Sequence, residues 1–140
     1  MATRSTIALE FNDGSIQQIY CHWDGYIDHN GRILSEHYSN PDKLGELMLL
    51  GDLSTLKEEI GVQHPFSPIG VMTNDEYERQ FGKMCTAYGR DRGETGTAAR
   101  KFDNFKMYKM EAQFEEYNYI LRADGKWMVN GRELVIKEAA

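Results

Sequence analysis

The chain has 140 residues and a net charge of −6, with 27% charged and 41% hydrophobic residues. This length and composition predict one globular domain, residues 1–140, and exclude a wholly disordered chain. The acidic balance argues against nucleic acid as a partner, because binding to phosphates depends on an excess of Lys and Arg. No stretch approaches the roughly 20 apolar residues of a membrane span, and the N-terminus lacks a signal peptide pattern. We therefore expect a soluble, intracellular protein that does not bind membranes.

Residues 6–23 have the pattern of a β-hairpin. Ile7 and Leu9 alternate with smaller or polar residues, and Asn12–Gly14 supplies a turn. The return run, 15–23, alternates in the same way. The period of two predicts strands here rather than a helix.

Helices are predicted after the hairpin. The first covers about residues 33–38, where apolar residues follow helical spacing. The second begins with Asn40 as N-cap and Pro41 in the first turn, and Gly51 is placed to end it. The segment 52–60 is interpreted as one more short helical piece.

Proline marks the middle of the chain as irregular. Pro65 and Pro68 predict a surface loop over 61–72, because neither residue can donate a backbone hydrogen bond. The run 73–76 then matches a capping box that begins another helix. Residues 83–88 are interpreted as a central strand.

The next segment is rich in glycine. Residues 89–96 predict a loop, since glycine weakens both helix and strand interiors. Thr97 is placed to cap a helix that runs to about Met110, but the alternation at 105–107 also fits a strand. Both alternatives remain open for residues 98–111.

The C-terminal part predicts a three-stranded meander. The strands 117–122, 126–129 and 132–137 are separated by Asp124-Gly125 and Asn130-Gly131, which are typical of tight hairpin turns. Strands at both ends and helices between them predict an α+β fold. We expect a mainly antiparallel sheet, built from the N-terminal hairpin and the C-terminal meander, with helices packed on one face.

The stretch from Cys21 to Gly31, CHWDGYIDHNG, concentrates polar and aromatic residues. His22, Trp23, Asp24 and Tyr26 are candidates for a pocket that stacks on a flat ligand such as a nucleotide base. Histidine and aspartate are also zinc ligands, but their spacing here matches no known ligand pattern, so we predict no metal site. The alternative is structural: the Asp-Gly and Asn-Gly pairs form turns, and the histidines are partly buried and hydrogen-bonded.

A second candidate loop is YGRDRGE, residues 88–94, in which Arg90, Asp91, Arg92 and Glu94 are candidate ligand-binding residues. Arg90 and Arg92 carry planar guanidinium groups that suit phosphate or carboxylate, and glycine lets backbone amides approach an anion. The segment is not a Walker loop, since no Gly-Lys-Ser/Thr follows. Alternatively, the arginines pair internally with Asp91, Glu94 or other acids, or they bind an acidic partner surface.

Nucleophilic catalysis has little support in the sequence. Cys21 and Cys85 lie in apolar runs and are expected to be buried free thiols. Adjacent strand residues point to opposite faces, so Cys21 and His22 do not form a dyad. An acid–base pair that joins Asp24 or His22 to the 88–94 loop requires the two loops to meet, and the sequence leaves that open.

Several segments combine Trp, His, Asp and Arg in a distinctive pattern. They are 3–8, 19–26, 29–31, 50–56, 90–94, 115–119 and 125–127. Through these motifs the chain resembles, over nearly its whole length, a family of small uncharacterised proteins encoded mostly by tailed bacteriophages and prophages. The resemblance implies an accessory protein in the host bacterial cytoplasm that inhibits, sequesters or redirects a host component.

Two hypotheses follow. The first is a host-takeover or counter-defence binding protein, whose target is a host protein or a small nucleotide held between the His22–Tyr26 turn and the Arg90/Arg92 loop. The second is a small enzyme acting on a nucleotide or a phosphorylated substrate, with His22 or Asp24 as base. Neither requires a cofactor, and self-association through an exposed strand edge is left open.

Overall fold

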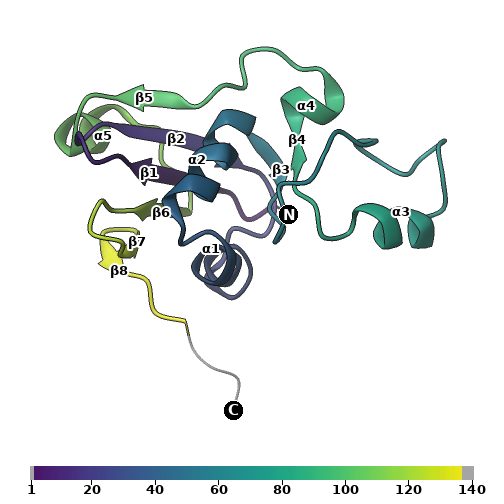
Figure 1. The fold of residues 1–140 in the computed structure, drawn as a ribbon, viewed down its shortest axis with the longest axis horizontal. Coiled ribbons are helices and arrows are strands. Elements are labelled where there is room, and N and C mark those ends of the chain that lie inside the picture. Colours follow the sequence, from purple (N-terminus) through teal and green to yellow (C-terminus); the bar gives the residue numbers. More distant parts are fainter. Residues whose placement is uncertain (1, 137–140) are drawn as a thin grey trace.

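The computed structural model describes residues 2–136, which form an eight-stranded sheet with helices on both of its faces (Figure 1). The strands lie in the order β4-β3-β2-β1-β6-β7-β8, and β5 pairs with β2. They are β1 (Ser5–Glu10), β2 (Ile16–Cys21), β3 (Leu53–Thr55), β4 (Thr86–Ala87), β5 (Arg100–Phe102), β6 (Tyr117–Leu121), β7 (Trp127–Val129) and β8 (Arg132–Glu133). The helices are α1 (Arg32–His37), α2 (Pro41–Leu50), α3 (Asn74–Phe81), α4 (Tyr88–Arg92) and α5 (Phe105–Glu111), with a π-helical turn η1 (Ile27–Gly31). The predicted α+β class with a mostly antiparallel sheet is confirmed.

The two ends of the chain meet at the centre of the sheet. β1 pairs antiparallel with β2, where Ile7 lies opposite Ile19, and parallel with β6, where Ile7 lies beside Tyr119. A second parallel pair joins β2 to β3. The sheet is therefore mixed, and the N-terminal and C-terminal strands belong to one continuous layer.

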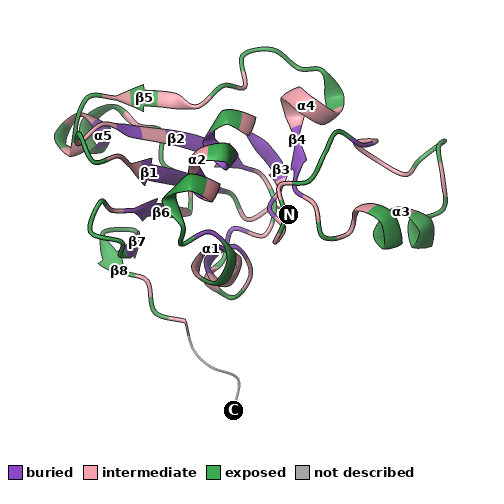
Figure 2. Ribbon diagram, viewed as in Figure 1, coloured by how far each residue is buried: buried purple, intermediate pink, exposed green. Residues whose placement is uncertain are grey.

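Both faces of the central strands are apolar. Along β1, Ile7 and Leu9 pack with α1 and α2 in the larger core cluster, whereas Ala8 packs with Ile120 and Tyr108 in a second cluster on the opposite face. Figure 2 shows the central strands buried between these layers. The expectation that helices cover only one face is therefore wrong: α5 covers the second face.

Local capping signals placed two helices correctly. The Asn40 side chain accepts a hydrogen bond from the Asp42 amide at 2.9 Å, and α2 ends at Gly51 with a φ of 85°. Before α3, Thr73 Oγ1 accepts from the Glu76 amide at 3.2 Å. Each bond satisfies an amide that the first helical turn leaves without a partner.

Pairing between distant segments overrides local patterns elsewhere. The segment 52–60, expected to be helical, contains β3, because Leu53 pairs with Cys21 of β2 and both are fully buried. The strand expected at 83–88 is shorter and is not central: β4 has two residues and lies at the edge of the sheet. These strands are formed by their neighbours rather than by their own propensity.

The glycine-rich loop and the ambiguous segment also differ from expectation. Residues 88–92 form α4, which ends at Gly93 with a φ of 73°, so the predicted loop is helical in its first half. The open choice at 98–111 resolves into both forms, β5 followed by α5. The cap of α5 is Asn104, whose side chain accepts from the Met107 amide at 2.9 Å, and not Thr97.

Between β3 and β4 the chain leaves the sheet as a protruding arm, residues 57–84, which carries α3 (Figure 1). The expected loop at 61–72 lies in this arm and contains no helix or strand. At the other end of the sheet β8 ends at Glu133, and residues 134–136 are not in a strand, so the predicted strand 132–137 is shorter than expected; Lys137 lies outside the described residues. In the part of the chain that the structure describes, no helix has the length and apolar character needed to cross a bilayer.

Candidate ligand-binding groove

The stretch from Cys21 to Gly31 is organised by a buried asparagine. Asn30 Nδ2 donates to Ser5 Oγ at 3.2 Å and to the Trp23 carbonyl at 3.3 Å, and it contacts Cys21 Sγ at 3.5 Å. The Asn30 amide also donates to the Asp24 carbonyl at 3.2 Å. A buried amide with this many partners fixes the course of the backbone, so the polar character of the stretch has a structural role.

The four candidate side chains of this stretch lie around the turn. His22 Nδ1 is hydrogen-bonded to Tyr20 Oη at 2.7 Å, and the imidazole meets the edge of the Trp23 ring with centroids 4.8 Å apart. Asp24 adopts a φ of 57°, a conformation that aspartate tolerates in turns. Trp23 and Tyr26 remain 42% and 41% exposed.

In α4 the arginine fork is engaged inside the protein. Arg90 Nη1 donates to the carbonyls of Ile60 at 2.9 Å and Gly61 at 3.2 Å, and Nη2 donates to the Cys85 carbonyl at 2.9 Å. Nε and Nη2 complete a bidentate pair with Asp91 at 3.0 and 3.1 Å. The guanidinium therefore holds the base of the arm against the sheet edge.

Asp91 is the fully buried acid of this cluster. Its Oδ1 accepts from the His64 amide at 3.1 Å, and its Oδ2 accepts from the Ala87 amide at 2.8 Å. The His64 ring lies in the same cluster, with Nε2 3.2 Å from Thr86 Oγ1. We call Arg90, Asp91 and His64 the arm anchor, because together they join the arm to α4 and β4.

Arg92 and Glu94 pair with each other. Arg92 Nε donates to Glu94 Oε2 at 2.6 Å, and the guanidinium lies over the Phe66 ring at 4.4 Å and over the Tyr88 ring at 4.9 Å. Of the interpretations left open by the sequence, these contacts match internal pairing.

The two candidate loops lie on opposite sides of β3. Leu53 pairs with Cys21 of β2 on one side and with Ala87, the residue before α4, on the other. Within the described residues no hydrogen bond, ion pair or ring contact joins the 21–31 stretch to the 88–94 segment. A site shared by the two loops would therefore have to span β3.

The described part of the chain contains neither a cluster of metal ligands nor a reactive thiol. No three His, Cys, Asp or Glu side chains lie close enough there to hold an ion. Cys21 and Cys85 are free and buried, as expected, and burial raises the pKa of the Cys21 thiol to about 12 and that of Cys85 as well. Neither is a thiolate at neutral pH.

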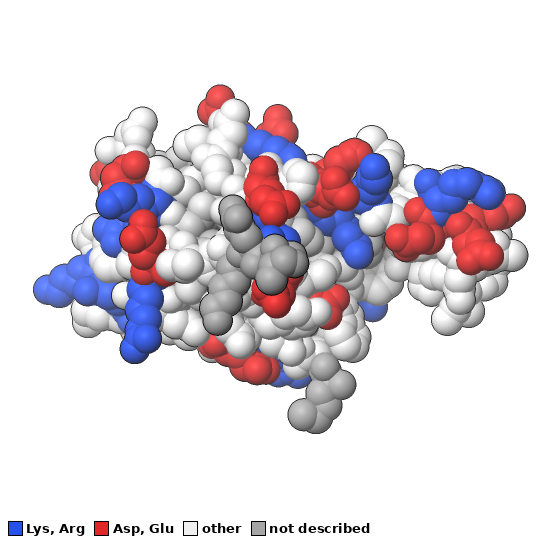
Figure 3. Space-filling model, turned by 90° about the horizontal axis from the view of Figure 1, so that it is seen from below, with Lys and Arg blue, Asp and Glu red and all other residues white. Residues whose placement is uncertain are grey.

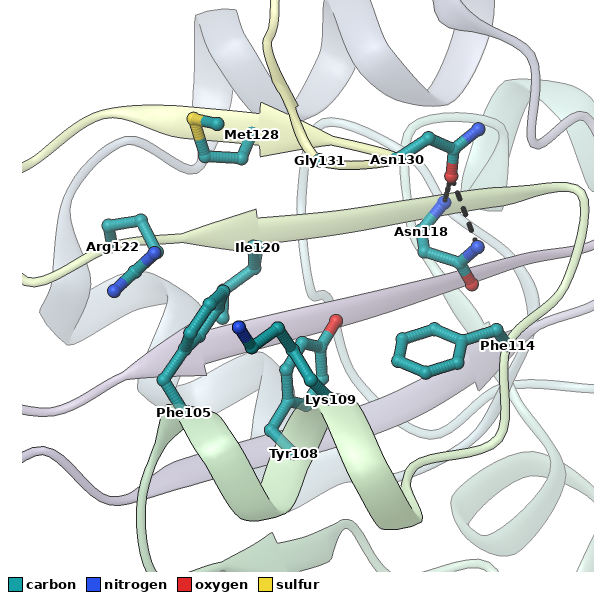
Figure 4. A pocket seen from close by; sticks show the side chains of 10 residues that line it. All are labelled: Phe105, Tyr108, Lys109, Phe114, Asn118, Ile120, Arg122, Met128, Asn130 and Gly131. Carbon is teal, nitrogen blue, oxygen red and sulfur yellow. Dashed lines mark hydrogen bonds between the residues drawn. The ribbon is translucent and has the colours of Figure 1, made fainter.

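Another hollow lies between α5 and strands β6 and β7 (Figure 4). This groove has a volume of about 680 Å³, within the range of small-molecule sites. Its walls are Phe105 and Tyr108 of α5 and Phe114 just beyond it, and its floor includes Ile120 and Met128. The Tyr108 ring lies 5.8 Å from the Phe105 ring and 5.5 Å from the Phe114 ring, so three aromatic groups form one surface.

Most polar groups of the groove are paired within the protein. Arg122 Nε donates to Glu10 Oε1 at 2.9 Å, and its guanidinium lies 3.7 Å from the centroid of the Phe105 ring. At the opposite end, Asn118 Nδ2 donates to Asn130 Oδ1 at 3.1 Å. Burial raises the pKa of Glu10, but the hydrogen bonds from the Arg122 side chain and the Ala123 backbone amide outweigh it, so the pKa is lowered overall.

Two groove groups lack such partners in the described chain. Tyr108 Oη makes no hydrogen bond, and Lys109 Nζ has no carboxylate within ion-pair distance. The Lys109 ammonium instead lies 5.0 Å from the Phe105 ring centroid, at the mouth of the groove (Figure 4). The Tyr108 oxygen is open to the groove, because no buried side-chain oxygen in the described chain lacks a partner. This pair distinguishes the groove from the arm anchor.

The groove lies in the basic part of an acidic chain. Residues 100–132 contain seven Lys and Arg against five Asp and Glu, whereas the whole chain contains 16 and 22. Figure 3 shows basic side chains outermost at the end of the molecule that carries α5 and the β6–β7 turn, left in that view. Lys109 and Arg122 line the groove and no Asp or Glu does, so the charge there favours an anionic ligand.

Sequence reasoning missed the groove. The spacing of Phe105, Tyr108 and Lys109 places them on one side of a helix, but the residues around them also fit a strand. A helix beginning at Asn104 would have identified this surface. Compared with family models, with curated proteins and with solved structures, the chain shows no match in any of the three.

Proposed function

We propose that this protein binds a small anionic ligand with a flat ring, of the nucleotide class, and that the groove between α5 and strands β6 and β7 is its site. The protein holds the ligand without transforming it. This keeps nucleotide binding as the function but moves the site away from the His22–Tyr26 turn and the Arg90/Arg92 loop.

The observation that carries this proposal is the combination of aromatic walls with an unpaired ammonium. Phe114 is 46% exposed and offers a ring surface on which any base can stack, a contact worth about 1–3 kcal/mol for each base, and Phe105 and Tyr108 line the same groove. Lys109 at the mouth supplies a positive charge that no described carboxylate neutralises. A nucleotide has both a ring and a phosphate, so it matches both features.

The expected biological setting comes from the resemblance to phage and prophage proteins. There the protein acts in the host bacterial cytoplasm and sequesters a host nucleotide, as a takeover or counter-defence factor. Binding without turnover suits this role, because a sequestering protein needs affinity and stoichiometry rather than a reaction.

Isothermal titration calorimetry with the four ribonucleoside 5′-monophosphates, and with the matching nucleosides, tests the proposal. We expect nucleotides to bind more tightly than nucleosides. Lys109→Ala should weaken nucleotide binding by about fivefold and leave nucleoside binding unchanged. Lys83→Ala removes the same positive charge from the arm, away from the groove, and is the matched control.

Two results would overturn the proposal. One is the absence of nucleotide binding at millimolar concentration. The other is an equal loss of nucleotide affinity in the Lys109 and Lys83 variants. Such a result would mean that the net charge of the protein, and not a lysine at the groove, controls binding. Mass spectrometry of the recovered nucleotide addresses the enzyme alternative: conversion of many equivalents per protein would contradict simple binding.

A host protein is the second candidate partner, and the arm is the feature that favours it. Ile69 is 87% exposed and Val71 is also exposed, and both precede α3, none of whose residues is buried. Cross-linking in host lysate should recover a partner with the wild type and lose it with the double variant Ile69→Glu/Val71→Glu. Leu49→Glu, an equally exposed position on α2, is the control. Equal recovery with both variants would exclude the arm.

A further inference from the structure

We infer that Tyr108 selects the ligand: its hydroxyl donates a hydrogen bond to an acceptor on the ligand's ring, such as a carbonyl of a nucleobase. This inference rests on the proposed function and adds the chemical feature that the ring must carry. A flat ring without an acceptor fills the same space but leaves the hydroxyl without a partner.

The hydroxyl of Tyr108 differs from those of the two fully buried tyrosines. Tyr38 Oη donates to the Lys57 carbonyl at 2.7 Å, and Tyr119 Oη donates to the Gly25 carbonyl at 2.6 Å. Tyr108 is only 4% exposed, yet its hydroxyl has no partner among the described residues. No side-chain nitrogen or oxygen that is itself buried lacks a partner among the described residues, so the unbonded Tyr108 oxygen is open to the groove, where it can bond a ligand that enters.

The position of the hydroxyl fits that role. In Figure 4 the Tyr108 oxygen lies between Phe114 and Ile120, inside the groove rather than at its rim. The Lys109 ammonium lies toward the Phe105 end. A ligand whose anionic group meets Lys109 therefore extends its ring past Tyr108 toward Phe114.

Other polar side chains of the groove are already committed to protein partners. Asn118 Oδ1 accepts from Thr6 Oγ1 at 2.9 Å and from the Glu115 amide at 2.8 Å. Asn130 Nδ2 donates to the Glu116 carbonyl at 3.0 Å. Tyr108 is thus the neutral polar side chain of the groove that makes no hydrogen bond within the described residues, whereas the guanidinium of Arg122 is held by Glu10.

Burial also keeps this hydroxyl protonated. It raises the pKa of Tyr108 to about 12, although the nearby Arg122 guanidinium acts in the opposite direction. At neutral pH the group is therefore an O–H donor and not a phenolate. It favours a ring acceptor and does not repel an anionic ligand.

The test compares two probes, uridine 5′-monophosphate and phenyl phosphate. Both carry a ring and a phosphate, but only the uracil ring has carbonyl acceptors. For Tyr108→Phe we expect about a tenfold loss of affinity for uridine 5′-monophosphate and no change for phenyl phosphate. Tyr26→Phe, at an exposed tyrosine outside the groove, should change neither. A ¹³Cζ label on tyrosine should show the Tyr108 resonance moving with the nucleotide and not with phenyl phosphate.

The possible results separate the inference from the function on which it rests. If uridine 5′-monophosphate binds wild type and Tyr108→Phe equally, the groove remains the site and the role of Tyr108 is overturned. If Tyr108→Phe weakens both probes alike, the hydroxyl supports the groove rather than reading the ring, and the inference is also overturned. If neither probe binds the wild type, the proposed function fails, and the inference fails with it.

Discussion

The arm anchor and the groove both contain polar side chains and use them differently. Arg90, Asp91 and His64 bond one another or nearby backbone, and they hold the arm in place. In the groove, Tyr108 and Lys109 keep a donor without an internal partner. The comparison teaches that residue type alone does not mark a binding site. A binding site is marked instead by donors and acceptors that have no partner within the protein.

A parallel within the two regions makes the point sharper. Arg92 lies over Phe66 and pairs with Glu94, and Arg122 lies over Phe105 and pairs with Glu10. Both arginines are engaged in the same way. What differs is the space beside them, because Arg122 borders a groove of about 680 Å³.

The largest effect should come from breaking the arm anchor. Asp91→Asn places an amide donor against the Ala87 amide or Arg90 and leaves that guanidinium without its charge partner. We expect the free energy of unfolding to fall by about 3 kcal/mol, measured by urea denaturation. Glu94→Gln, at a more exposed pair, should cost less than about 1 kcal/mol. A loss this small for Asp91→Asn would show that the anchor is not structural.

A smaller contrast is expected between two tyrosines. Tyr38→Phe removes the hydroxyl donor to the Lys57 carbonyl and leaves that carbonyl only the weaker bond from Cys85 Sγ at 3.4 Å, so it should lower the free energy of unfolding by about 1–2 kcal/mol. Tyr108→Phe removes a hydroxyl without an internal partner and should stay within about 0.5 kcal/mol of wild type. Both variants are measured by thermal and urea unfolding. If Tyr108→Phe loses as much stability as Tyr38→Phe, the Tyr108 hydroxyl makes a stabilising bond within the protein.

The smallest effect concerns Glu10 at the border of the groove. Its folded-state pKa lies below the usual 4.5, since the hydrogen bonds from Arg122 and the Ala123 amide outweigh burial. The carboxylate therefore stabilises the fold above pH 4.5, and this contribution disappears as the pH falls through the lowered pKa. Stability measured between pH 3 and pH 6 should rise less steeply with pH in Glu10→Gln. An unchanged slope would contradict the assignment.

The features that could be predicted from the sequence are those with local causes. Asn40 and Pro41 begin α2 through contacts within one turn, and Thr73 does the same for α3. β3 could not be predicted because its three residues form a strand only against distant partners: Leu53 pairs with Cys21, 32 positions earlier, and with Ala87, 34 positions later. The layer formed by α5 was missed because local alternation around Phe105 favoured neither helix nor strand.

The candidate site was harder to predict for a related reason. The polar stretch around His22 and the arginines of α4 have the residue types of a site, and the sequence cannot show that Asn30 or Asp91 organises them from within. Tyr108 is distinguished by a hydroxyl that has no hydrogen-bond partner within the protein. This can be recognised only from a three-dimensional structure, because it depends on the positions of all neighbouring atoms.

The parallel pairing of β1 with β6 has a consequence for how the molecule is made. Thr6 and Asn118, which bond each other, are separated by 112 positions, so most of the chain must leave the ribosome before the sheet closes. Contacts this distant in sequence slow folding, because a long loop must close before they form. The groove is therefore among the last parts to acquire its shape during synthesis, and a truncated product that lacks β6 would bind nothing there.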